Sequence, residues 1–138
     1  MEGTTNDRGV IYRSFEELFK VAESFLGFID FNFLASVFEV YNETVHDLLI
    51  EKHSNSNNKK DLSLHLRENE IYIDGLIERD ITSLEDVDHL LELSSENRIT
   101  ATNNLNKYSS RSHLILSVKI YGVSKNGERI NGKLNLIE

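Results

Sequence analysis

The run from Phe33 to Val40 is apolar at nearly every position, and it strongly limits the folds open to this chain. Strands that are covered on both faces read as near-continuous apolar runs, whereas half-exposed strands alternate between apolar and polar residues. A strand of this kind needs neighbouring strands and helices to bury it. With the helical segments described next, it predicts an α/β fold.

Two segments carry the signals of amphipathic helices. Ser14 and Glu17 form a capping box, which predicts a helix over about 14–26 after a loop at residues 1–13. Thr82 and Glu85 repeat the box, which predicts a second helix over about 83–97, with Arg98 near its negative end. The expected buried stripes are Phe15, Leu18, Phe19, Ala22 and Leu26 in the first helix and Leu84, Val87, Leu90 and Leu91 in the second.

Alternation and turn signals mark further strands in the middle of the chain. Residues 62–66 alternate between leucine and polar residues, and residues 71–73 repeat the pattern before a turn at Asp74-Gly75. Residues 45–50 are expected to be a short helical or extended piece. Residues 51–60 are polar and are expected to be a surface loop.

The C-terminal part reads as a hairpin. Its first strand should turn one apolar face inward, and Asn126-Gly127 is a strong turn signal before a last strand over 129–137. The inward residues are Leu114, Leu116, Val118 and Ile120. An exposed apolar edge in such a sheet promotes pairing with other chains, so we expect the isolated chain to be marginally stable or to self-associate.

Composition narrows the functional classes. At 138 residues the chain has the length of one domain, and its formal net charge of −8 argues against a nucleic-acid partner. No apolar stretch approaches the roughly 20 residues of a membrane span, so no membrane partner is expected. The chain has no cysteine, which excludes disulfides and thiolate metal sites. The five histidines lack metal-ligand spacing.

Residues 106–113, which read N-K-Y-S-S-R-S-H, concentrate three serines and one arginine between a helical stretch and a strand. Hydroxyls can bind a metal or a phosphoryl oxygen, and a guanidinium forms directional ion pairs, so this composition suits a loop that senses phosphate. The alternative is an ordinary turn rich in serine and asparagine.

The string N-x-x-S-S-R-S-H resembles the switch I signature of kinesin motor domains. Residues 38–49, F-E-V-Y-N-E-T-V-H-D-L-L, are similar to the strand and turn E-I-Y-N-E-x-I-x-D-L-L of that family, and residues 132–137 are similar to the strand before switch II. Residues 9–13, G-V-I-Y-R, look most like the C-terminal-motor, minus-end-directed branch. The resemblance covers essentially the whole chain and implies part of a P-loop NTPase motor fold, an α/β fold with a mixed sheet and flanking helices.

The resemblance also implies roles for individual residues. Ser109 and Ser110 would lie where switch I closes over the γ-phosphate of ATP, with the Ser110 hydroxyl nearest to Mg²⁺. Arg111 would form the ion pair with switch II, and Asn106 would shape the loop or order the water. Arg67 matches, on weak grounds, a loop that touches tubulin in kinesins. Microtubules would then be the partner, and the microtubule cytoskeleton of the cytoplasm the location.

Two nucleotide-contacting motifs of the family are missing from the sequence. No G-x-x-x-x-G-K-[ST] occurs, and switch II would begin at Glu138, where the family has Asp. We therefore interpret residues 1–138 as a partial kinesin motor domain, from just after the P-loop to the start of switch II, and expect no ATPase activity from it alone. The alternatives are a truncated gene model and a non-catalytic module that binds microtubules or an active kinesin partner chain.

Overall fold

A five-stranded sheet forms the centre of the computed structural model, which describes residues 9–41, 44–51, 62, 64–68, 70–102 and 112–138. Its strand order is β2-β1-β6-β7, with β5 paired beside β1, and every pair is antiparallel. The described elements are α1 (Val10–Ser24), β1 (Ile29–Tyr41), β2 (Thr44–Asp47), β3 (Leu64–Arg67), β4 (Glu70–Ile73), β5 (Arg79–Asp80), α2 (Leu84–Thr102), β6 (Ser112–Ser124) and β7 (Arg129–Ile137).

The long pairing of β1 with β6 sets the register of the sheet. The two strands pair over their full 13-residue lengths, from Ile29 opposite Ser124 to Tyr41 opposite Ser112. On the other side of β1, β2 pairs with its last residues and β5 with its middle. β7 pairs only with β6 among the described strands and therefore forms an edge.

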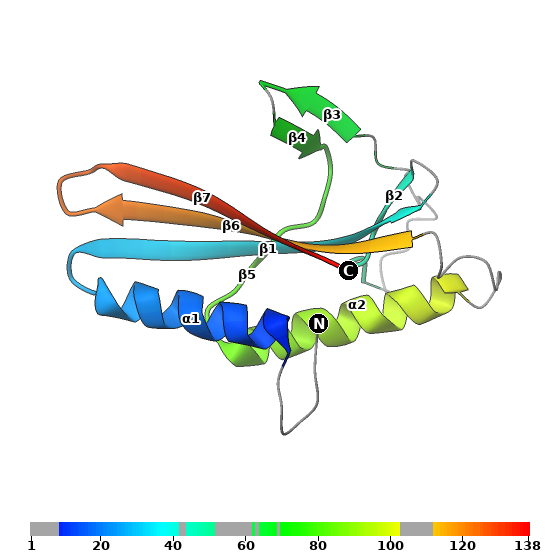
Figure 1. Cartoon of the computed structure of the whole chain (residues 1–138), viewed down its shortest axis with the longest axis horizontal. Helices are drawn as coiled ribbons and strands as arrows, with labels where there is room; N and C mark the ends of the chain where they lie inside the picture. The colour runs from blue at the N-terminus through cyan, green and yellow to red at the C-terminus, as the bar shows by residue number, and fades with distance from the viewer. Residues whose placement is uncertain (1–8, 42–43, 52–61, 63, 69, 103–111) are drawn as a thin grey trace.

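Both helices lie on one side of this sheet, which we call the helix face (Figure 1). Side chains alternate across a strand, so the odd-numbered residues of β1 and the even-numbered residues of β6 point toward the helices. Phe15 of α1 is fully buried there, and Phe19 packs edge-on against Phe33 with ring centroids 5.7 Å apart. The core residues are Ile11, Phe15, Phe33, Ala35, Val37, Leu48, Leu49, Ile81, Val87, Leu90, Leu91, Leu114, Leu116 and Val118.

The opposite side, which we call the open face, carries the separate β3–β4 hairpin (Figure 1). Phe38 and Ser36 of β1 are buried on this side, and Lys119 of β6 forms an ion pair with Glu78. A groove of about 250 Å³ runs between these side chains and Ile73 of the hairpin. The predicted coverage of the apolar run on both faces is thus confirmed for residues 35–39.

The first helix begins one turn earlier than its capping signal predicts. It starts at Val10 with Gly9 as N-cap and no side-chain cap, so Ser14 and Glu17 lie inside the helix and the predicted capping box is wrong. The reason is burial: Ile11 is as deeply buried as Phe15, four residues later, and both need the helical spacing to reach the core. Residues 10–13 are therefore helical, whereas the sequence predicts a loop.

The helix also ends before its predicted last residue. Ser24 is the final helical residue, and Leu26 is 73% exposed, so its predicted place in the buried stripe is wrong. Gly27 follows with a φ of +89°, a left-handed conformation that favours glycine. The chain then reverses into β1, as the predicted glycine stop requires.

The second helix keeps its predicted buried stripe but has a different cap. Ser83 accepts a hydrogen bond from the Asp86 amide, and the Asp86 carboxylate accepts from the Thr82 amide and hydroxyl. The box is therefore shifted by one residue, and the predicted role of Glu85 is wrong. These hydrogen bonds from Thr82 lower the pKa of Asp86. The helix continues to Thr102, beyond the predicted end at Asn97.

The C-terminal hairpin follows its prediction closely. β7 has the predicted bounds, and Gly127 takes a φ of +81° in the turn, where its amide donates to the Ser124 carbonyl. The turn at Asp74-Gly75 is also present, with a φ of +81° at Gly75. The piece at residues 45–50, predicted to be either helical or extended, begins as strand β2, which covers residues 44–47. Most of the predicted loop at residues 51–60 lies outside the described residues.

Candidate functional site at the base of the serine-rich segment

The four residues predicted to sense nucleotide, Asn106, Ser109, Ser110 and Arg111, lie outside the described residues. Arg67 belongs to β3, where its backbone pairs with Glu70, but its side chain is also outside the description. The structure does describe the elements on both sides of residues 103–111, which we call the serine-rich segment from here on. The segment leaves the end of α2 at Thr102 and enters the sheet at Ser112, the first residue of β6.

The entry point lies between β1 and the C-terminal end of the chain. Ser112 is opposite Tyr41 in the register, and the Leu114 and Glu138 backbones exchange two hydrogen bonds, with N–O distances of 3.2 and 2.9 Å. Glu138 is the residue at which the resemblance places the start of switch II. The structure therefore places Glu138 two positions along the strand from the end of the serine-rich segment.

A buried carboxylate lies beside this entry point. Glu39 is completely buried on the helix face of β1, and its Oε1 is 3.4 Å from the Nε of Arg98 on α2. Neither Glu39 oxygen accepts a hydrogen bond from the described residues, and the buried Ser112 hydroxyl likewise has no such partner. A buried charge of this kind is costly unless a cation compensates it. Arg98 supplies that compensation across the gap between helix and sheet.

Asn97, next to Arg98 on α2, hydrogen-bonds the helix to the residues that follow β2. The Asn97 side-chain amide donates to the carbonyl oxygens of Leu48, at 2.7 Å, and Ile50, at 3.0 Å. Asp47 organises the same segment, because its carboxylate accepts from the amides of Leu49 and Ile77. Burial raises the pKa of Asp47, while these two hydrogen bonds act in the opposite direction.

Sequence reasoning missed the contributions of Glu39, Asn97 and Arg98 to this site. A signal was present: Glu39 is the one charged residue in the apolar run from Phe33 to Val40, at an odd position that the strand period turns inward. A charge at such a position predicts a buried partner. Its partner could not be identified because the predicted helix ended before Arg98.

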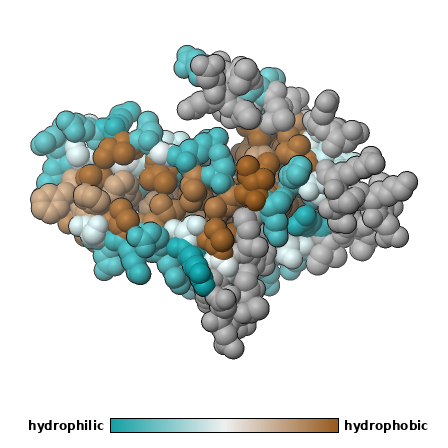
Figure 2. Space-filling model, in the orientation of Figure 1, coloured by the Kyte–Doolittle hydropathy of each residue, from teal (hydrophilic) through white to brown (hydrophobic). Residues whose placement is uncertain are grey.

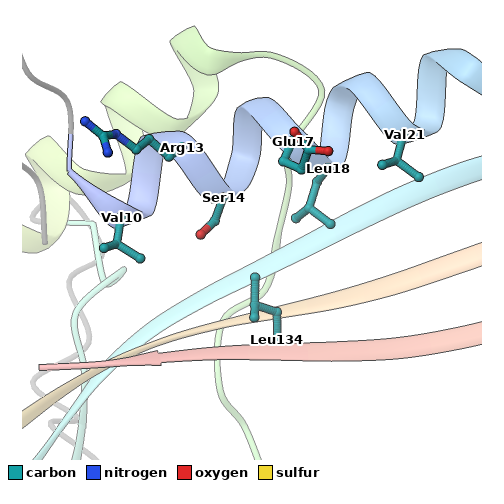
Figure 3. A pocket seen from close by; sticks show the side chains of 7 residues that line it. All are labelled: Val10, Arg13, Ser14, Glu17, Leu18, Val21 and Leu134. Carbon is teal, nitrogen blue, oxygen red and sulfur yellow. The ribbon is translucent and has the colours of Figure 1, made fainter.

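A second hollow lies at the edge of the helix face. A groove of about 560 Å³ runs between α1 and β7, and Leu134 points from β7 toward the helix (Figure 3). Its other lining residues are Val10, Arg13, Ser14, Glu17, Leu18 and Val21. Figure 2 shows apolar side chains along this side of the molecule between polar rims. Its lining is mainly apolar, and no cluster of polar groups converges in it.

Two further properties of the described part of the chain bear on the site. Neither helix there has the length and apolar character of a membrane-crossing segment. Within the same residues, no three histidine, aspartate or glutamate side chains gather where they could hold a metal ion. Any metal contact made by Ser110 would lie outside this part of the chain.

Comparisons with known proteins give one consistent result. The family model of the kinesin motor domain matches residues 1–138. Kinesin-like protein KIN-14E of Oryza sativa subsp. japonica is 37% identical over 139 residues, and KIN-14R of Arabidopsis thaliana is 36% identical over 140 residues. Each alignment covers 100% of this chain and 13% of the relative. A solved structure of a fast kinesin matches with a TM-score of 0.85 and 31% identity, over 99% of this chain and 39% of that chain.

Proposed function

Since the chain belongs to the kinesin motor domain family, we propose that its 138 residues act as part of an ATP-dependent microtubule motor. We place them between the P-loop and switch II of the motor domain. One observation supports this placement most directly: Ser112, which ends the switch-like segment, lies on the strand that bonds Glu138, where switch II would begin. Two segments that must respond to the same phosphate would thus start from one site.

The proposed chemistry uses residues 109–111. The Ser109 and Ser110 hydroxyls suit phosphate and Mg²⁺, because this ion keeps several waters and takes few protein ligands. Bound Mg²⁺ would neutralise charge on the phosphates during transfer. Arg111 would pair with a carboxylate of switch II, and Asn106 would hydrogen-bond within the loop. These residues respond to a nucleotide that the P-loop amides and lysine hold.

The residues fit only part of a nucleotide site. The sequence contains no G-x-x-x-x-G-K-[ST], so the amides and lysine that supply most of the phosphate affinity must come from elsewhere. We therefore propose that the 138-residue chain alone does not bind ATP. Titration of a fluorescent ATP analogue with Mg²⁺ should give no saturable signal. Saturable binding that Ser110→Ala abolishes would contradict this proposal.

Replacing the matching segment of a complete, active kinesin motor by residues 1–138 tests the switch roles. The graft should restore microtubule-stimulated ATP hydrolysis. Ser110→Ala and Arg111→Ala should then lower the rate by about 100-fold or more, as expected when a positioned charge-stabilising group is lost. Lys125→Ala, in the distant β6–β7 turn, is the control and should leave the rate unchanged. An active graft that tolerates Arg111→Ala would remove the switch assignment.

The second candidate is a non-catalytic module that binds microtubules or a partner kinesin chain. The β3–β4 hairpin supports it, because this two-stranded unit projects from the open face and carries Arg67 (Figure 1). Co-sedimentation of the chain with microtubules at two salt concentrations tests it. Binding that weakens with salt and with Arg67→Ala would favour the module. Pelleting no greater than that of a microtubule-free sample would exclude the microtubule-binding version, and co-purification with a kinesin motor would test the partner version.

A further inference from the structure

Glu39 is difficult to explain as part of an ordinary core. It is completely buried, it lies on the same face of β1 as Ala35 and Val37, and neither carboxylate oxygen accepts a hydrogen bond from the described residues. An apolar side chain of similar size would avoid the cost of burying this charge, and such replacements are often neutral or stabilising. The carboxylate therefore does not contribute mainly to stability.

The position of Glu39 relates it to both ends of the serine-rich segment. On the sheet side, Glu39 is opposite Leu114, and the next pair on the same face is Tyr41 with Ser112, where the segment ends. On the helix side, its cation partner Arg98 lies one turn before Thr102, where the segment starts. One ion pair thus joins the helix that leads into the segment to the sheet that the segment enters.

A second contact ties the same end of α2 to a different part of the chain. Asn97 ties α2 to the carbonyls of Leu48 and Ile50, which belong to the segment after β2. The Glu39–Arg98 ion pair joins α2 to β1 beside the start of β6.

We propose that Glu39 and Arg98 are a positioning pair that sets the separation of the α2 end and the β6 start. Neither residue touches nucleotide in this proposal. The inference rests on the proposed function in one respect, because the segment whose ends it fixes is the proposed nucleotide sensor. The anchoring itself makes no reference to ATP.

Hydrogen–deuterium exchange of the 138-residue chain tests the anchoring. Glu39→Gln should raise exchange at the amides of residues 97–102 and 112–114 by about tenfold or more, with a much smaller change in the β6–β7 hairpin. Glu78→Gln is the matched control, since it removes the same charge from an ion pair on the open face. It should leave the amides of residues 97–102 and 112–114 at the wild-type rate.

A double variant separates positioning from plain stability. Glu39→Leu with Arg98→Met removes both charges and should return the thermal transition to near the wild-type value, because no unpaired charge stays buried. Exchange at residues 97–102 and 112–114 should stay raised. The proposal would be overturned if the double variant regained both the wild-type unfolding temperature and the wild-type exchange rates at these amides. It would also be overturned if Glu39→Gln exchanged at the wild-type rate. If Glu39→Gln does not fold, the double variant decides.

The exchange test and the graft experiment can contradict the positioning pair and the nucleotide role independently of each other. Raised local exchange with an inactive graft would keep the positioning pair and remove the nucleotide role. An active graft that depends on Ser110, together with unchanged exchange in Glu39→Gln, would keep the nucleotide role and remove the pair.

Discussion

One face of the central sheet packs on α1 and α2, whereas the other faces the small β3–β4 hairpin across a groove (Figure 1). Among the described residues, the helix face contributes most of the buried apolar side chains, together with the fully buried carboxylate of Glu39. The open face mixes Phe38 with serines and the Lys119–Glu78 pair. In the described residues, the apolar core thus lies mainly on one side of the sheet, with a thinner layer on the other. Substitutions should therefore have different costs on the two faces.

The same substitution on each face gives the largest contrast. Phe15→Ala should destabilise the chain by about 3–5 kcal/mol, because Phe15 is fully buried among packed side chains. Phe38→Ala should cost roughly half as much, since Phe38 lines a groove into which water can move. Urea unfolding followed by circular dichroism measures both values. Equal costs would mean that the hairpin packs as tightly as the helices.

The close approach of β1 and β6 on the helix face gives the next effect. A Cβ atom at Gly122 would lie 2.8 Å from the Phe31 ring, which is too close for normal contact. Gly122→Ala should therefore cost about 1–3 kcal/mol through overpacking. Gly132→Ala is the control, because its nearest contact would be an ordinary 3.6 Å to Ile120. A cost at Gly132 equal to that at Gly122 would show that loss of glycine, rather than the contact with Phe31, is responsible.

The ion pair on the open face should matter much less. Lys119 and Glu78 are each about one-third exposed, so solvent screens their attraction. Glu78→Gln should change the free energy of unfolding by about 1 kcal/mol or less. A double-mutant cycle with Lys119→Met isolates the pair. A coupling energy of several kcal/mol would place this ion pair in the same class as Glu39–Arg98.

The helix cap predicts a pH effect on the helix-face layer. Asp86 has a lowered pKa in the folded chain, so its contribution to stability is present above its unfolded pKa of 3.8 and is lost as the pH falls through the lower folded value. The stability difference between wild type and Asp86→Asn should shrink on acidification below about pH 4. Thermal unfolding across that range measures it, and a pH-independent difference would contradict the expectation.

The edge strand β7 should affect association more than stability. Ile137 is 63% exposed on this edge, and exposed apolar edges favour pairing between chains. Ile137→Lys should shift the sedimentation profile toward monomer with little change in the unfolding midpoint. Val21→Lys, exposed on α1, is the control for added charge alone. Monomeric wild type at high concentration would refute the predicted self-association.

Local patterns predicted most of the elements but few of their ends. The confirmed predictions concern features that neighbouring residues determine. They are the alternation of Leu114, Leu116 and Val118 and the turn at Asn126-Gly127. The start of α1 depends on whether Ile11 reaches the core, which is a tertiary property. A capping box at Ser14 was therefore outweighed by burial one turn earlier.

The site was less predictable than the fold. The serine-rich string indicates a family and a chemistry, but its four proposed nucleotide residues lie outside the described part of the chain. The Glu39–Arg98 contact joins residues 59 positions apart, since 98 − 39 = 59, and depends on how α2 crosses the sheet. No local period encodes that crossing. The charge inside an apolar run indicated a partner without identifying it.

The uninterrupted ladder between β1 and β6 has a mechanical consequence. A slip of one residue would turn Leu116 and Val118 away from the helices, so sliding of one strand along the other is strongly disfavoured. The two strands, each roughly 40 Å long, must therefore twist and tilt as one stiff plate. A rotation of the β1–β6 pair near Ser112 is therefore transmitted to its other end at Ser124, on the opposite side of the molecule.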